Sequence, residues 1–138
     1  MERSSELEEF VRDSYAIMTR GDVEAFDAAT SRSEGTLVIG TDPEEWWEGS
    51  PAIRAAFQGQ TEAMGGGFPL LAGDIRAYVD GDVGWFADRP SFTLPDGTEL
   101  AIRLTGVLRR EDGDWRWVQV HTSIGVANES AFGQELPV

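Results

Sequence analysis

Residues 106–123 read GVLRREDGDWRWVQVHTS, and this stretch decides the fold more than any other part of the chain. Two runs of strand-forming residues flank an acidic turn at 111–114, which is the pattern of a β-hairpin. The second run carries His121, the only histidine in the protein. Strands joined in this way are typical of a meander sheet, so the stretch predicts antiparallel strands in the last third of the chain.

The segments upstream of this hairpin predict an α+β fold. Asp-Gly turns at 80–82 and 95–97 separate further expected strands, at 70–79, 83–94 and 99–110. Before them, helical spacing predicts a helix that ends at Gly21, a short helix after Asp22, and a third that begins at Ser50-Pro51. Three helices followed by a long meander predict helices packed on one face of a curved, cone-shaped antiparallel sheet. The open end of such a cone is a natural pocket.

Composition limits the possible partners and compartments. The 138 residues fit one domain spanning 1–138, and a net charge of −14 disfavours binding to nucleic acids and anionic membranes. All 11 basic residues are arginine, which fits either a GC-rich genome or adaptation to high salt. The absence of cysteine excludes disulfides and thiolate metal sites. We find neither a signal-peptide pattern nor an apolar run near the ~20 residues that span a bilayer, and expect a cytoplasmic protein.

Asp42 and His121 are the candidate catalytic residues. Histidine has an unperturbed pKa of about 6.5, which suits proton transfer. Asp42 precedes Pro43 beside two tryptophans, where lost hydration would raise the pKa of its carboxyl toward that of a general base. The alternatives are a structural or interface role for His121 and an ordinary Asp-Pro turn for Asp42. A lone histidine is poor evidence for a metal site, and we expect no cofactor.

Strand alternation supplies candidate ligand-binding residues. It places Gln119, His121 and Ser123 on the same face as Trp115 and Trp117. A face that mixes polar and large groups suits a cavity wall or a hydrated dimer interface. A tryptophan pair suits a flat apolar ligand, and an arginine that faces the cavity could bind a carboxylate. The candidates are Tyr15, Trp46, Trp47, Phe57, Trp85, Arg103, Thr105, Gln119 and Ser123.

Three segments carry a family resemblance: RGDVEA at 20–25, GTDPEEWWEG at 40–49, and the stretch from LRR at 108–110 to HTS at 121–123. In order and spacing they resemble the nuclear transport factor 2-like superfamily, and within it the SnoaL-like proteins, from about Glu6 to Asn128. The resemblance implies a cone-shaped fold. It does not fix an activity, because the superfamily includes isomerases, dehydratases, cyclases and epoxide hydrolases as well as non-enzymes. The last hairpin most resembles the calcium/calmodulin-dependent kinase II association domain.

Comparison with the ketosteroid isomerases of this superfamily gives a partial match. Asp42 matches the position of their carboxylate base. Ser14 occupies the place of their tyrosine, with Tyr15 one residue away, and one residue turns a helical side chain by roughly 100°. Thr105 falls near the position of their protonated acid and cannot replace it. This pattern argues against steroid isomerisation.

Two functions therefore stay open. The first is a pocket domain for a small, largely apolar metabolite, with isomerase-, cyclase- or hydrolase-type chemistry. It predicts that Asp42, His121, Tyr15 and Arg103 converge on one cavity. The second is a non-catalytic association domain that dimerises through its sheet face. We expect a homodimeric pocket domain and leave open whether it is an enzyme.

Overall fold

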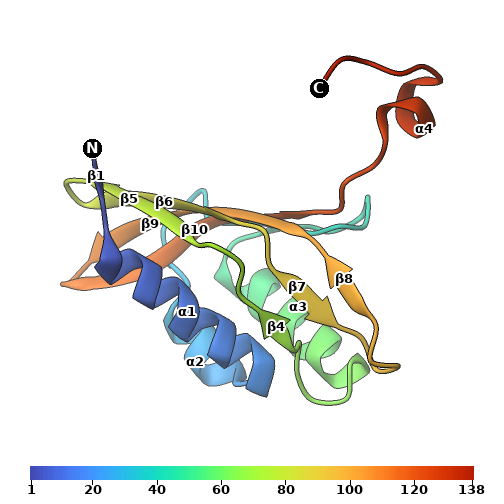
Figure 1. Ribbon diagram of the computed structural model, residues 1–138. Helices are drawn as coiled ribbons and strands as arrows, with labels where there is room; N and C mark the ends of the chain where they lie inside the picture. The colour runs from blue at the N-terminus through green and yellow to red at the C-terminus, as the bar shows by residue number, and fades with distance from the viewer.

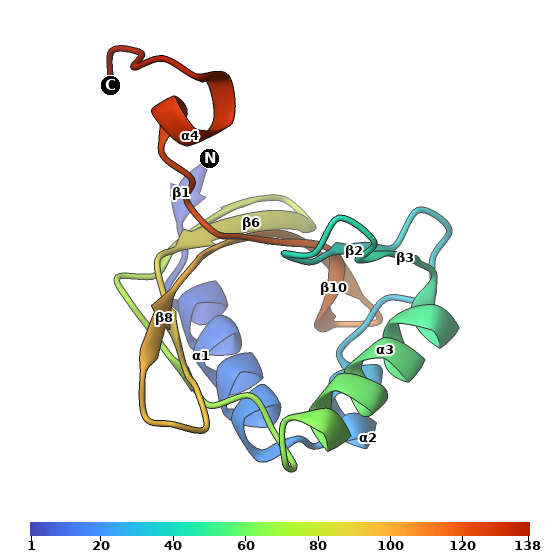
Figure 2. The same ribbon diagram turned by 90° about the vertical axis from the view of Figure 1, so that its right-hand side faces the viewer.

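The chain folds as the predicted α+β cone, and the computed structural model describes residues 1–138. Figures 1 and 2 show α1 (Ser5–Arg20), α2 (Val23–Ala28) and α3 (Ser50–Ala63) on one side of a curved sheet, whereas α4 (Asn128–Phe132) projects from the opposite side. Of these helices, only α4 was not predicted. None combines the length and apolar character needed to cross a bilayer. The strands are β1 (Glu2–Arg3), β2 (Leu37–Ile39), β3 (Trp46–Glu48), β4 (Leu70–Leu71), β5 (Arg76–Asp80), β6 (Val83–Asp88), β7 (Ser91–Thr93), β8 (Glu99–Ala101), β9 (Arg103–Glu111) and β10 (Asp114–Ser123).

The main sheet has seven strands in the order β1-β5-β6-β9-β10-β2-β3. Four of these strands, β5, β6, β9 and β10, pair in that order as the expected antiparallel meander. One pairing differs from the prediction, because β2 lies parallel to β10. This parallel pair makes the sheet mixed. The β2–β3 hairpin precedes α3 in the chain, yet it extends the sheet at the edge beside β10.

The long strands expected from the sequence are interrupted, and their far ends form a second sheet of three strands, β4-β7-β8. Pro90 separates β6 from β7, because proline has no N–H to donate to a strand ladder. The N–H of Ile102 donates to the carbonyl of Pro90 at 3.1 Å, so the two neighbouring strands bend at the same level. The second sheet turns toward the helices and closes one side of the cone (Figures 1 and 2).

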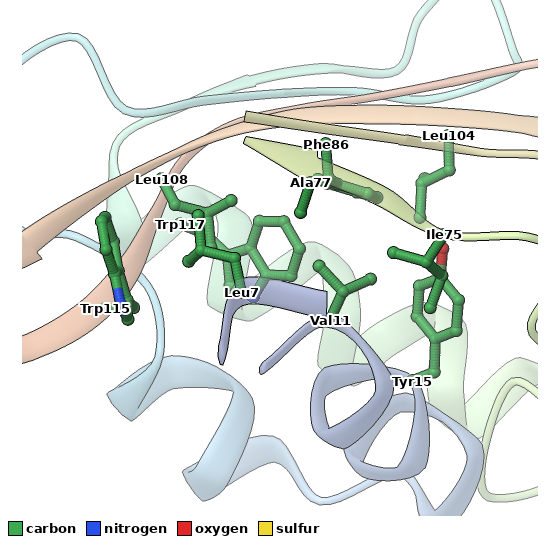
Figure 3. Close-up of a cluster of buried hydrophobic side chains, with 10 residues drawn as sticks. All are labelled: Leu7, Val11, Tyr15, Ile75, Ala77, Phe86, Leu104, Leu108, Trp115 and Trp117. Atoms are coloured by element: carbon green, nitrogen blue, oxygen red, sulfur yellow. The ribbon is translucent and has the colours of Figure 1, made fainter. Parts of the chain in front are cut away.

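The hydrophobic core lies between α1 and the middle of the main sheet (Figure 3). Helix α1 presents Leu7, Val11 and Tyr15 at a spacing of four residues, which places them on one face of the helix. Gly21 ends α1 as predicted, with a left-handed φ of 66° that favours glycine. The sheet contributes the other members of this core: Ile75, just before β5, and Ala77, Phe86, Leu104, Leu108, Trp115 and Trp117.

A β-bulge in β10 changes which residues face the helices. The register with β9 shifts between Trp117 and Gln119, so Val118 is the extra residue. Two hydrogen bonds of 2.8 Å hold Trp117 to the segment before β2: its N–H donates to the carbonyl of Ala29, and its carbonyl accepts from the N–H of Ser31. The single face predicted from Trp115 to Ser123 is therefore wrong, because alternation reverses at the bulge.

Candidate functional site

A cavity of about 440 Å³ occupies the open end of the cone. Its walls come from α3, the β2–β3 hairpin, the second sheet and the part of β10 after the bulge. Eighteen of its 26 lining residues are hydrophobic. Phe26 and Phe57 stack at 4.0 Å between ring centroids, and Phe68 and Phe92 extend this aromatic wall. The cavity is therefore suited to an apolar molecule.

Glu45 is the only ionisable side chain among the residues that line the cavity. It lies in the turn of the β2–β3 hairpin and is partly buried. Its Oε1 accepts a hydrogen bond from the backbone N–H of Asp42 at 2.8 Å, and its Oε2 accepts one from Nε2 of Gln60 at 2.5 Å. Glu45 and Gln60 were not predicted as site residues, because they meet only when the folded hairpin packs against α3.

Asp42 does not line the cavity and lies exposed in the same turn. Its Oδ1 accepts from the backbone N–H of Glu44 at 2.9 Å. This is the ordinary Asp-Pro turn that was the alternative to a catalytic role. The carboxylate that reaches the cavity belongs to Glu45, three residues farther along the chain.

His121 lies on the outer face of the sheet, away from the helices. It pairs with Thr105 of β9 and, on its other side, with Ile39 of β2. Both His121 and Thr105 are exposed. Arg103 and Ser123 share this face, and Nε of Arg103 donates to Oγ of Ser123 at 3.2 Å. The bulge at Val118 causes this placement, because it directs Val118, Val120 and Thr122 toward the cavity in place of His121.

Tyr15 belongs to the hydrophobic core. Its hydroxyl donates to Oδ2 of Asp88 at 2.9 Å, and the backbone N–H groups of Gly73 and Arg89 also donate to this carboxylate. Burial, the nearby charge of Asp88 and the hydrogen bond to it raise the pKa of the Tyr15 hydroxyl. A tyrosine held in this way stabilises the packing of α1 against the sheet and does not reach the cavity.

The expected convergence of Asp42, His121, Tyr15 and Arg103 on one cavity therefore does not occur. Of the ligand-binding candidates, Trp47, Phe57 and Gln119 line the cavity. The others lie elsewhere: Tyr15 in the core, and Trp46, Trp85, Arg103, Thr105 and Ser123 outside the cavity lining.

Glu111 fixes the segment that leads from α2 to β2, and so supports one wall of the cavity. Its Oε2 accepts from the hydroxyls of Ser31 at 2.8 Å and Ser33 at 3.1 Å, and from the guanidinium of Arg109. Burial by itself raises the pKa of Glu111. The hydrogen bonds from Ser31, Arg109 and Ser33 outweigh burial and hold this pKa below its usual range.

Comparison with known proteins assigns the family. The model of the SnoaL-like domain matches residues 7–127. The chain belongs to the SnoaL-like domain family. This SnoaL-like chain has no match among curated proteins.

Solved structures with the fold of this SnoaL-like chain cover most of its length. An NTF2-like protein of unknown function from Pseudomonas putida superposes with a TM-score of 0.81 and 16% identity, over 96% of this chain and 92% of that one. A candidate calcium/calmodulin-dependent protein kinase type II association domain from Thiobacillus denitrificans superposes with a TM-score of 0.72 and 25% identity, over 86% of this chain and 94% of that one. A candidate ketosteroid isomerase from Parabacteroides distasonis superposes with a TM-score of 0.70 and 17% identity, over 86% of this chain and 85% of that one. These similarities confirm the predicted nuclear transport factor 2-like fold.

Proposed function

We propose that this SnoaL-like chain binds a small, largely apolar molecule in the cavity at the open end of the cone. The observation that carries the proposal is the cavity itself, about 440 Å³ in volume and lined mainly by hydrophobic side chains. Small-molecule sites typically have volumes of roughly 300–1,000 Å³ and apolar walls with a few polar groups. Burial of an apolar ligand there would be favoured by roughly 25 cal/mol for each Å² removed from water.

The geometry supports binding better than acid–base catalysis. Isomerase-, cyclase- or hydrolase-type chemistry requires groups that exchange protons with the substrate. Glu45 is the only ionisable group that lines the cavity, whereas His121 lies on the outer face and Tyr15 is bonded to Asp88 in the core. Binding is therefore the function that we propose for the cavity.

Neighbouring alanines on α3 provide a test with a matched control. Ala56 lines the cavity, and Ala55 is exposed on the same helix. We expect naphthalene or a steroid to raise the melting temperature of the wild-type protein and to change the tryptophan fluorescence, because Trp47 and Trp117 line the cavity. Ala56→Phe should abolish both responses, and Ala55→Phe should preserve them. Equal responses from the two variants would show that the ligand binds elsewhere.

We further propose that two copies of the chain associate through the outer face of the main sheet. A row of paired residues crosses four strands there, from Thr105 through His121 and Ile39 to Trp46. Trp46 is 57% exposed and adds a large apolar side chain to the end of this row. The 25% identity to a candidate association domain is a second argument in favour of this proposal.

Light scattering at micromolar concentration tests the association. We expect a dimer, because a stable interface buries about 1,200–2,000 Å² and this face offers an extended surface. Trp46→Lys should yield a monomer. Leu71→Lys is the matched control, since Leu71 is 59% exposed but lies on the second sheet. A wild-type monomer, or equal effects of the two variants, would contradict the proposal.

A further inference from the structure

The carboxylate of Glu45 is held at the cavity wall by three hydrogen bonds from two parts of the chain. Within its own hairpin, Oε1 accepts from the N–H of Asp42 at 2.8 Å and from the hydroxyl of Thr41 at 3.4 Å. From α3, Nε2 of Gln60 donates to Oε2 at 2.5 Å. An ionised carboxylate offers about four acceptor positions, so a position remains for another donor.

Gly40 provides the space for this arrangement. A Cβ atom on Gly40 would lie 2.8 Å from both Cβ and Cδ of Glu45 and 2.9 Å from its Oε1. The Glu45 side chain therefore folds across the bare backbone of Gly40 toward Gln60. Gly40 does not have a positive φ, so the need for glycine here is spatial and not conformational. The hairpin is built so that this carboxylate turns inward.

No positive side chain balances this carboxylate. Glu45 takes part in none of the ten salt bridges, and no arginine lines the cavity. A carboxylate at an apolar wall loses hydration, and each unused acceptor position adds to that cost. A ligand group that donates a hydrogen bond would offset the loss, most effectively if it is positively charged.

We infer that Glu45, positioned by Gly40 and Gln60, selects ligands whose apolar body carries a hydrogen-bond-donating group, an ammonium above all, and rejects carboxylates. This inference rests on the proposed binding function of the cavity. The overall charge of −14 acts in the same direction, because it attracts cations and repels anions. Arg103, the residue expected from the sequence to bind a carboxylate, lies on the outer face and cannot serve the cavity.

Three probes with the same apolar body test the inference: 1-naphthylmethylamine, 1-naphthylmethanol and 1-naphthoic acid. Binding is measured by calorimetry at neutral pH on the full-length protein. For the wild type we expect the amine to bind most tightly, the alcohol next and the acid most weakly. Glu45→Gln should weaken binding of the amine by roughly tenfold or more, because a hydrogen bond to a charged group is lost, and should bring the acid closer to the alcohol.

Gly40→Ala is the second variant, because it displaces Glu45 without changing its chemistry. It should reproduce the loss of preference for the amine, while Gly59→Ala, an exposed glycine with open space around its Cβ position, should leave the preference intact. If the three probes bind the wild type equally, or if Glu45→Gln preserves the preference, the inference about Glu45 is overturned and the cavity proposal stands. If none of the probes binds, the binding function itself is overturned.

Discussion

The two ends of the cone use the same sheet and nearly the same residue types, yet one end is filled and the other is hollow. At the filled end, α1 lies against β5 and β6 of the main sheet, and Leu7, Val11 and Leu108 are fully buried. At the hollow end, α3 faces the sheet across a cavity of about 440 Å³. Trp117 belongs to both, since it packs in the core and also lines the cavity.

This difference shows that hydrophobic composition alone does not separate a core from a pocket. Both ends are lined mainly by apolar side chains, and the distinction comes from how the backbone is arranged around them. The second sheet turns away from the main sheet at Pro90, and the bulge at Val118 reverses the inward face of β10. These two irregularities lie where the filled end gives way to the hollow end.

The largest expected effect is on stability at the filled end. Leu108→Ala should lower the free energy of unfolding by about 2–5 kcal/mol, because it removes a fully buried side chain from close packing. Leu100→Ala removes the same atoms from the cavity wall, where Leu100 is only partly buried, and should cost about 1 kcal/mol or less. Urea unfolding of both variants gives the comparison. Equal losses would mean that the two ends are packed alike.

A smaller effect should follow from Tyr15→Phe at the filled end. The variant keeps the ring in the core but removes the donor to Asp88, and should lower the free energy of unfolding by about 1–3 kcal/mol. Binding of a cavity ligand should not change, because the hydroxyl does not reach the cavity. Tyr78→Phe is the control, since Tyr78 stacks on Trp85 outside this core. If Tyr15→Phe lost ligand binding, the hydroxyl in the filled end would be needed for the shape of the cavity, which would contradict this prediction.

Acid should weaken the hydrogen bonds by which Glu111 holds the segment between α2 and β2. Because hydrogen bonds hold the folded-state pKa of Glu111 low, its contribution to stability is complete above the unfolded pKa of about 4.3 and is lost as the pH falls through the folded value. At neutral pH the wild type should therefore have a higher melting temperature than Glu111→Gln. The two melting temperatures should converge as the pH falls from about 5 toward 3. The exposed Asp114, changed to Asn, is the control. A constant difference in melting temperature between wild type and Glu111→Gln across this range would contradict the assignment.

Much of the fold was predictable because its signals are local. The Asp-Gly turns, the helix end at Gly21 and the proline at the start of α3 each act over a few residues, and each is seen in the structure. The bulge was not predictable, because it depends on hydrogen bonds between Trp117 and the distant Ala29–Ser31 segment. The inward carboxylate of Glu45 was not predictable either, because it depends on α3 and on the space that Gly40 leaves. The site thus depends on tertiary contacts that a single strand pattern does not contain.

The smallest expected effect belongs to the residue that the sequence made most prominent. His121→Ala should leave ligand affinity unchanged, because the bulge places His121 on the outer face, and an exposed substitution should alter stability by no more than about 0.5 kcal/mol. Thr122→Ala, at the next position in β10, removes a side chain from the cavity lining and should change the affinity. Calorimetry with 1-naphthylmethylamine compares the two. If His121→Ala lowers the affinity more than Thr122→Ala does, then His121 faces the cavity and Thr122 faces outward, contrary to the alternation set by the bulge.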